Sequence, residues 1–216
     1  MKYKTIAVIG LGQFGTTIAK MLASMSHEVL GVDINPEIVQ KVSPYVTHAI
    51  VADTTDEEAI KALALSQFDI VIVAIGDNIQ ANLMTSMLLK EMKMPHVVSK
   101  AENALQGKML KKMGVDMVIY PEYDVAQRLA QSLTREHVMD YLQLSKSISL
   151  IEVDMPKFLV GTCLKDSNLR EKYNLNAVGI RRGEDLEVPP NPFTILSAEE
   201  KLLIIGNNSD LDALTV

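Results

Sequence analysis

Six short apolar segments recur in the first part of the chain, and each is followed by a stretch in which apolar side chains have helical spacing. The segments are residues 5–10, 28–33, 47–51, 70–75, 96–99 and 117–120. Strands that alternate with helices predict a parallel sheet. The run Ile70–Val73 has no polar face, as expected of a strand covered on both sides by helices. We therefore predict a doubly wound, Rossmann-like α/β domain.

A further helical pattern follows Pro121. Val125, Leu129 and Leu133 have four-residue spacing, and the pattern runs on toward Val138 and Leu142. It predicts a connecting helix whose apolar stripe packs on the following domain or on a second subunit, which makes a dimer a reasonable hypothesis.

The pattern then changes to shorter segments. Residues 149–153, 177–182 and 201–205 are predicted strands, and residues 164–173 are a predicted helix between the first two of them. We expect a second, small α+β domain. The predicted division is residues 1–122 for the sheet domain, 123–141 for the connecting helix and 142–216 for the small domain.

Three glycines directly follow the first predicted strand. Gly10, Gly12 and Gly15 have the spacing in which one glycine makes a tight turn, one allows a phosphate to approach and one lets a helix pack on the strand. The helix that begins near Gln13 would direct free N–H groups at phosphate. Asp33 ends the second strand, where a carboxylate can accept hydrogen bonds from ribose hydroxyls and would repel a 2′-phosphate.

Other strand ends add candidate ligand contacts. Asp53 could accept from an adenine amino group or serve a local turn, while Thr55 and Glu58 match a capping box. Lys100 and Glu102 could face a phosphate and a divalent cation, or form a surface pair. The residues predicted to form the nucleotide site are Gly10, Gly12, Gln13, Phe14, Gly15, Asp33, Asp53, Thr54, Ala74, Ile75, Gly76, Lys100 and Glu102.

Composition and charge limit the classes of protein to which the chain can belong. The 48% hydrophobic and 22% charged content is typical of a globular protein, and the net charge of −6 argues against nucleic-acid binding. One cysteine, an opening that leads straight into a strand and no bilayer-length apolar run favour the cytoplasm. The four histidines share no ligand spacing, so no zinc site is predicted.

The motifs in their order resemble an RCK domain protein, the cytosolic subunit of Ktr/Trk potassium-uptake systems. The residues that carry the resemblance are 7–15, 53–56, 73–78 and 100–102. The resemblance covers the whole chain and implies a protein that is not an enzyme. It implies ATP, ADP or NAD(H) in the glycine-rich site and a homodimer that assembles into an octameric ring. The ring would gate an integral-membrane potassium-translocating subunit of KtrB, KtrD or TrkH type from the inner face of the membrane.

The resemblance also assigns individual residues. Such subunits often carry Arg where this chain has Gln13, which leaves discrimination between ATP and ADP open. Glu102 matches the family's acid near a neighbouring subunit's nucleotide, where it could hold a divalent cation. Related small domains often bind cyclic di-AMP between two copies. The residues that match that pocket are Arg170, Leu175, Asn176, Ala177, Val178 and Pro192.

Two further functions remain open. A small NAD-dependent oxidoreductase or a redox-sensing Rossmann protein would use the same glycine loop, although the residues for a substrate wall are missing. A Rossmann transcriptional repressor is disfavoured by the acidic balance and by the lack of a basic helix-turn-helix. Arg170 and Lys172 have an alternative interpretation as the solvated face of a helix.

Overall fold

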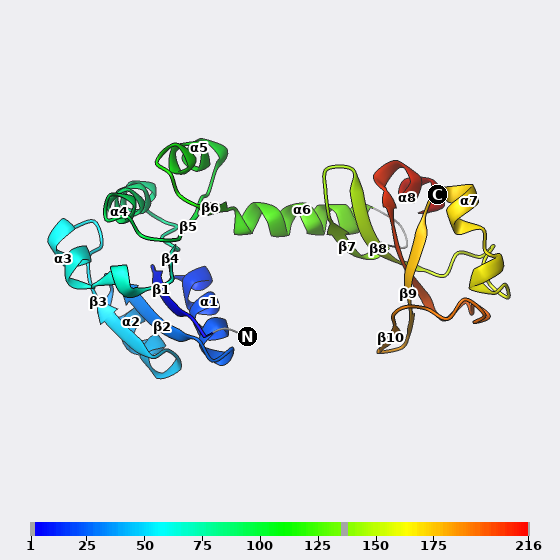
Figure 1. The fold of residues 1–216 in the computed structure, drawn as a ribbon, viewed down its shortest axis with the longest axis horizontal. Coiled ribbons are helices and arrows are strands. Elements are labelled where there is room, and N and C mark those ends of the chain that lie inside the picture. Colours follow the sequence, from blue (N-terminus) through cyan, green and yellow to red (C-terminus); the bar gives the residue numbers. More distant parts are fainter. Residues whose placement is uncertain (1–2, 135–137, 216) are drawn as a thin grey trace. The chain divides into compact units, whose positions relative to one another are not determined.

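The chain folds into two compact units, Met1–Tyr123 and Asp124–Val216, and the computed structural model describes residues 3–134 and 138–215 (Figure 1). The first unit alternates strands and helices. Its elements are β1 (Thr5–Ile9), α1 (Gln13–Ser24), β2 (Glu28–Asp33), α2 (Pro36–Val42), β3 (His48–Val51), α3 (Glu57–Ala62), β4 (Ile70–Val73), α4 (Ile79–Glu91), β5 (Val97–Lys100), α5 (Ala104–Lys112), β6 (Met117–Ile119) and the start of α6 (Pro121–Thr134).

The six strands of the first unit form a parallel sheet in the order β3-β2-β1-β4-β5-β6. The order reverses between β1 and β4, whose registers place Ala7 beside both Leu30 of β2 and Val71 of β4. Ligands of doubly wound sheets bind outside the carboxyl ends of the strands at this reversal. The prediction of a doubly wound parallel sheet is confirmed.

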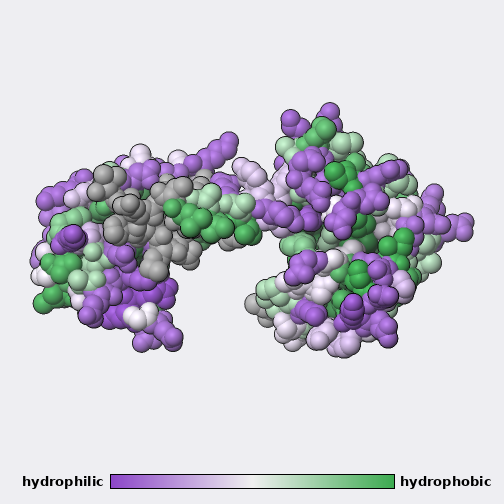
Figure 2. All heavy atoms as spheres, turned by 180° about the vertical axis from the view of Figure 1, so that it is seen from behind, coloured by the Kyte–Doolittle hydropathy of each residue, from purple (hydrophilic) through white to green (hydrophobic). Residues whose placement is uncertain are grey.

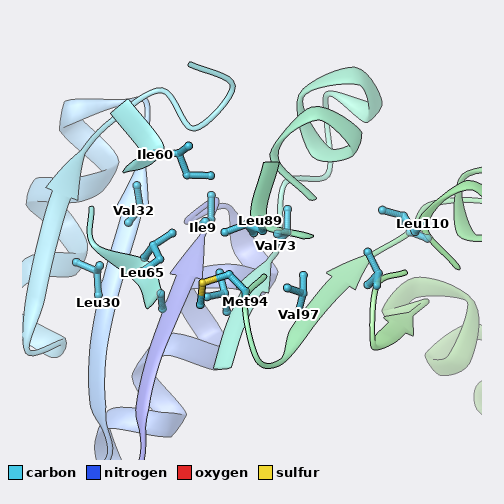
Figure 3. Packing of buried hydrophobic residues seen from close by; sticks show 14 residues of the cluster. Ile9, Leu30, Val32, Ile60, Leu65, Val73, Leu89, Met94, Val97 and Leu110 are labelled. Carbon is cyan, nitrogen blue, oxygen red and sulfur yellow. The ribbon is translucent and has the colours of Figure 1, made fainter. Parts of the chain in front are cut away.

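Both faces of the sheet are buried. Ala7 and Ile9 of β1 belong to one hydrophobic core with Ile60, Leu89 and Leu110 from α3, α4 and α5, and Figure 3 labels Ile9 and these three helix residues. Successive side chains of a strand point to opposite faces. Ile6 and Val8 accordingly pack against α1 and α2 on the other side. The continuous apolar strands read from the sequence are therefore a consequence of two helical layers.

The second unit has an antiparallel sheet of five strands in the order β10-β9-β11-β8-β7. Its elements are β7 (Val138–Gln143), β8 (Ile148–Asp154), α7 (Leu169–Tyr173), β9 (Asn176–Arg182), β10 (Asp185–Glu187), β11 (Lys201–Asn207) and α8 (Asn208–Thr215). Leu169 of α7 and Leu211 of α8 join Ile151, Ile180 and Leu202 in one core. The predicted small α+β domain is confirmed.

Two predictions about helices in this part of the chain are wrong. The helical pattern does not continue through Val138 and Leu142, because these residues lie in β7 and pair with Val153 and Leu150 of β8. The predicted helix over residues 164–173 is broken into a 3₁₀ turn, Leu164–Asp166, and α7. Asn168 separates them with a left-handed φ of 52°, which ends any continuous helix.

On the face that Figure 2 presents, hydrophilic residues surround hydrophobic residues that gather into small groups. Exposed apolar side chains of α6 include Val125, Leu129 and Leu133. Among the residues that the structure describes, no helix has both the length and the apolar character needed to cross a bilayer.

Candidate nucleotide-binding site

A cleft of about 590 Å³ lies at the carboxyl ends of the parallel strands, across the reversal of strand order. Its volume is within the range of small-molecule sites, roughly 300–1,000 Å³. The predicted residues that line it are Gly10, Gly12, Gln13, Phe14, Asp33, Asp53, Thr54, Ala74, Ile75, Gly76 and Lys100. The structure thus brings together eleven of the thirteen predicted nucleotide-site residues, and only Gly15 and Glu102 do not line the cleft.

The three glycines have three different surroundings. Gly10 has a φ of +87°, and a Cβ there would lie 2.8 Å from the backbone nitrogen of Ile75. A Cβ on Gly15 would lie 1.8 Å from the carbonyl oxygen of Gly10, so α1 can approach β1 only through a glycine. A Cβ on Gly12 would meet nothing within 4 Å. Of these three glycines, only Gly12 borders open space. A phosphate could therefore approach the backbone at Gly12.

Helix α1 begins at this open space. Gly12 is its N-cap and supplies no side-chain acceptor, so the first-turn N–H groups have no side-chain cap. Unpaired N–H groups and the positive end of the helix dipole attract anions. The loop and the helix together offer a phosphate both a close approach and hydrogen-bond donors.

Asp33 is fixed beside the glycine loop. Its Oδ2 accepts from the backbone N–H of Leu11 at 2.6 Å, and its Oδ1 accepts from the backbone N–H of Asn35 at 2.8 Å. These bonds hold the carboxylate at the edge of the cleft. Each carboxylate oxygen has a second lone pair, which leaves acceptor capacity for ribose hydroxyls.

Asp53 has a local turn role. Its Oδ1 accepts from the hydroxyl of Thr55 at 2.7 Å and from the backbone N–H of Thr55 at 2.9 Å. Hydrogen bonds from the Thr55 side chain and backbone hold the pKa of the Asp53 carboxyl below its usual range. Asp53 also lines the cleft, so this role does not exclude a ligand contact.

The predicted capping box at Thr55 and Glu58 is wrong. Asp56 caps α3 instead, since its Oδ1 accepts from the backbone N–H of Glu58 at 2.8 Å and of Ala59 at 3.1 Å. Thr55 is occupied with Asp53 and lines the cleft.

Lys100 is the one basic side chain among the cleft-lining residues, all of which the structure describes. Its side chain is 9% exposed, and its Nζ lies 2.6 Å from Oε1 of Glu122 in the first turn of α6. The hydrogen bond from Lys100 is the main reason that the pKa of the Glu122 carboxyl lies below its ordinary value. Gly76 leaves room for Lys100, because a Cβ there would lie 3.0 Å from the Lys100 Nζ.

The Glu102 carboxylate also lies close to Gly76. A Cβ on Gly76 would be 3.4 Å from the Glu102 Oε1, although Glu102 does not itself line the cleft. Within residues 3–134 and 138–215, no three His, Cys, Asp or Glu side chains group in a way that could hold a metal ion. Glu102 as a cation ligand therefore stays a prediction.

Sequence reasoning missed Glu122 and nine other residues of the cleft. The missed residues are Ile9, Ile34, Asn35, Ile38, Ala52, Thr55, Asp77, Asn78, Ala81 and Glu122. One signal was available for Glu122: it follows β6 by three residues, and the carboxyl ends of all six parallel strands meet at the same edge of the sheet. Asn78 caps α4, since its side chain accepts from the backbone N–H of Ala81.

A smaller cavity of about 250 Å³ lies in the second unit. Arg170, Leu175, Asn176 and Ala177 line it as expected, whereas Val178 and Pro192 do not. Val178 lies within strand β9, and the Pro192 carbonyl accepts from the backbone N–H of Lys165 at 2.8 Å, at the rim.

Two more side chains define the surroundings of this cavity. The Lys165 ammonium lies 5.5 Å from the centre of the exposed Phe193 ring. The half-buried thiol of Cys163 donates to Oδ2 of Asp166 at 2.9 Å.

The amino-acid sequence of the chain matches two known domain families and several known proteins. Residues 6–121 match the TrkA-N domain family and residues 148–215 match the TrkA-C domain family. The chain is 40% identical over 208 residues to Ktr system potassium uptake protein C of Bacillus subtilis (strain 168), covering 96% of this chain and 94% of the relative. It is 41% identical over 211 residues to Ktr system potassium uptake protein A of the same organism, covering 98% and 95%.

Solved structures support the same fold. The crystal structure of the GsuK RCK domain matches with a TM-score of 0.70 and 16% identity, covering 99% of this chain and 48% of that one. The GsuK channel bound to NAD matches with a TM-score of 0.68 and 18% identity, covering 99% of this chain and 39% of that one. At these identities the likeness concerns the fold alone.

Proposed function

The chain belongs to the family of Ktr and Trk potassium-uptake regulatory proteins, with a TrkA-N and a TrkA-C domain, and on that premise we propose that it is a ligand-controlled regulatory subunit and not an enzyme. It binds ATP, ADP or NAD(H) in the cleft of the first unit and cyclic di-AMP in the second. It acts in the cytoplasm on an integral-membrane potassium-translocating subunit.

The observation that carries the proposal is the arrangement at the strand reversal. The open approach at Gly12, the uncapped start of α1 and the carboxylate of Asp33 supply a phosphate contact and a ribose contact next to each other. A nucleoside phosphate needs both. The cleft extends from Asp53, after β3, to Lys100, at the end of β5, so it includes both halves of the sheet.

The ion pair of Lys100 and Glu122 suggests how a bound nucleotide changes the protein. A phosphate near Lys100 competes with the Glu122 carboxylate for the same ammonium. Glu122 is the second residue of α6, and α6 is the helix that leads into the second unit. A ligand that prefers one arrangement of this pair shifts the population of states, whereas one that binds both arrangements equally has no effect.

Assembly is the second part of the proposal. The apolar side chains exposed along α6, among them Leu133, which is 76% exposed, are suited to pack against a second copy of the chain. Dimers of this kind would assemble into an octameric ring that contacts the membrane subunit. Sedimentation of the wild type and of Val125→Asp tests this point, because a charged residue in the stripe would lower the oligomeric state.

The cavity lined by Arg170 and Asn176 supports the assignment of cyclic di-AMP to the second unit. A guanidinium pairs with a phosphate, and an amide can bond an adenine edge. At about 250 Å³ the cavity of one chain is small for a cyclic dinucleotide, which fits a ligand shared between two copies.

Calorimetric titration of the whole protein with ATP, ADP, NADH and cyclic di-AMP tests the proposal directly. We expect micromolar binding of at least one adenine nucleotide, binding of cyclic di-AMP and no consumption of either. Turnover of NADH with a small substrate, seen as a change of nicotinamide absorbance, would instead favour the oxidoreductase. Absence of all binding would overturn the assignment of both sites.

A further inference from the structure

A group of polar side chains is buried behind the cleft, between the sheet and helices α4 and α5. Asn82, Ser86 and Ser99 are fully buried, and Gln106 is 2% exposed. Their surroundings are apolar, since Val73, Leu89, Val97 and Leu110 belong to the core on the same side of the sheet (Figure 3). Polar groups in such a layer are costly unless each one is hydrogen-bonded.

Asn82 is the centre of this group. Its Nδ2 donates to the carbonyl of Ile75 at 3.0 Å and to the carbonyl of Lys100 at 3.1 Å. Its Oδ1 accepts from the hydroxyl of Ser99 at 3.2 Å and from Nε2 of Gln106 at 3.1 Å. Both amide hydrogens and both lone pairs are used, which is the full capacity of an asparagine side chain.

The two carbonyls belong to the loops that form one wall of the cleft. Strands β4 and β5 pair as far as Val73 and Ser99, and the ladder stops there. Beyond it, the Asn82 side chain connects Ile75 to Lys100 in place of ladder bonds. The side chain of Asn82 therefore sets the separation between the loop of Gly76 and the backbone from which Lys100 extends.

Gln106 connects Asn82 to the backbone of Glu102, two residues after Lys100. Its Oε1 accepts from the backbone N–H of Glu102 at 2.9 Å, while its Nε2 bonds Asn82. The hub defined by Asn82, Ser99 and Gln106 thus fixes the backbone on both sides of Lys100. None of these hydrogen bonds goes to Gly12 or Asp33, which line the other half of the cleft.

We propose that Asn82 is a positioning residue that sets the β4–β5 half of the nucleotide cleft, and thereby the affinity for the part of a ligand that extends beyond the first mononucleotide. The inference rests on the proposed nucleotide binding. A satisfied amide network adds little net stability over apolar packing but specifies one geometry. Asn82 acts through Ile75, Gly76 and Lys100 and touches the cleft only through them.

The test compares two probes that differ in reach. AMP occupies the half with Gly12 and Asp33, whereas NADH extends across the strand reversal to the half with Lys100. In Asn82→Leu, we expect the affinity for NADH to fall about tenfold or more, because the groups at Gly76 and Lys100 would no longer be positioned to contact it. The affinity for AMP should stay within about twofold. Titrations of the whole protein with each probe give both values.

Ser86→Ala is the matched control, because Ser86 lies on the same helix and bonds the hydroxyl of Ser99 but neither loop carbonyl. It should leave the NADH to AMP ratio unchanged. Gln106→Met is the milder variant for the case in which Asn82→Leu does not fold, and it should shift the ratio in the same direction. Thermal unfolding checks that each variant is folded.

A parallel loss of AMP and NADH affinity in folded variants would assign the hub to general stability and overturn the inference. An unchanged ratio in both Asn82→Leu and Gln106→Met would overturn it as well. Failure of the wild type to bind either probe is a separate result, which overturns the proposed nucleotide function and the inference together.

Discussion

The ammonium of Lys100 and the carboxylate of Glu122 lie 2.6 Å apart in the nucleotide cleft, and they differ sharply in exposure. The Lys100 side chain is 9% exposed and that of Glu122 is 66% exposed. The lysine is therefore the fixed member of the pair. The glutamate is the member that solvent, or a ligand, can replace.

This exposure predicts opposite effects of two substitutions on ADP binding measured without divalent cations. Lys100→Met removes a charge-assisted contact to phosphate and should weaken ADP binding about tenfold to a hundredfold, the equivalent of about 1.5–3 kcal/mol. Glu122→Gln removes the competing carboxylate and should strengthen it. Calorimetry of both variants checks the prediction, and weaker binding in both would show that Glu122 contacts the ligand itself.

The same pair predicts a pH dependence of stability. The hydrogen bond from Lys100 lowers the pKa of Glu122 from its ordinary 4.5, so the pair stabilises the fold above that pH. The contribution is lost as the pH falls through the lowered pKa of the folded state. Because the Glu122 side chain is 66% exposed, solvent screens the pair and we expect a contribution of less than about 1 kcal/mol. Melting temperatures of the wild type and Glu122→Gln should therefore differ slightly near neutral pH and converge in acid.

Lys100→Met supplies the control for that series. In this background Glu122→Gln should no longer change the pH dependence of the melting temperature. A difference that persists without Lys100 would assign the stabilisation to another partner of Glu122.

The glycine loop predicts a separation of folding from binding. Gly15→Ala would place a Cβ 1.8 Å from the Gly10 carbonyl, and we expect a loss of about 3 kcal/mol of unfolding free energy. Gly12→Ala meets no atom within 4 Å and should unfold like the wild type. It should nevertheless bind nucleotide at least about tenfold more weakly, because the methyl group occupies the approach to the phosphate. Denaturant unfolding and calorimetry give the two quantities, and normal binding by Gly12→Ala would remove the loop from the phosphate contact.

The charge of the cleft predicts a preference among nucleotides. Lys100 is balanced by Glu122, and Asp33, Asp53 and Asp77 also line the space. Gln13, at the first position of α1, adds no charge. Gln13→Arg should therefore raise the affinity for ATP about tenfold relative to NADH, which carries fewer phosphate charges. Gln13→Met is the neutral control, and equal gains for both nucleotides would contradict the electrostatic explanation.

The second cavity predicts a contribution of Arg170. Arg170→Ala removes the guanidinium proposed to pair with a phosphate and should weaken cyclic di-AMP binding about tenfold to a hundredfold. Lys172→Ala is the matched control, because Lys172 lies on the same helix and does not line the cavity. Titration of both variants gives the comparison. Similar losses of cyclic di-AMP affinity in the two variants would attribute the effect to general surface charge.

The parallel sheet was predictable because short, continuous apolar runs alternate along the chain with stretches of helical spacing. The predicted strand 28–33 matches β2 at both ends. Their spacing also predicts the structural roles of Gly10, Gly12 and Gly15, since a strand-to-helix turn around a phosphate restricts the backbone at those positions.

Other features depend on contacts that no local pattern contains. The residues of β7 are spaced as in a helix and form a strand because β8 follows closely enough to pair with them. Glu122 belongs to the cleft only because α6 starts beside the end of β5. The local sequence does not distinguish Asn82 from other helix residues, because its bonds to the carbonyls of Ile75 and Lys100 form only in the folded domain.

Cys163 is the single cysteine of the chain, and it is half-buried next to two residues, Leu164 and Lys165, that line the second cavity. A thiol-reactive fluorophore or spin label would therefore attach at one place only, without engineered cysteines. Its signal would report on the environment of the second unit while the nucleotide cleft stays chemically untouched. The occupancy of one site could be followed spectroscopically as the other is titrated.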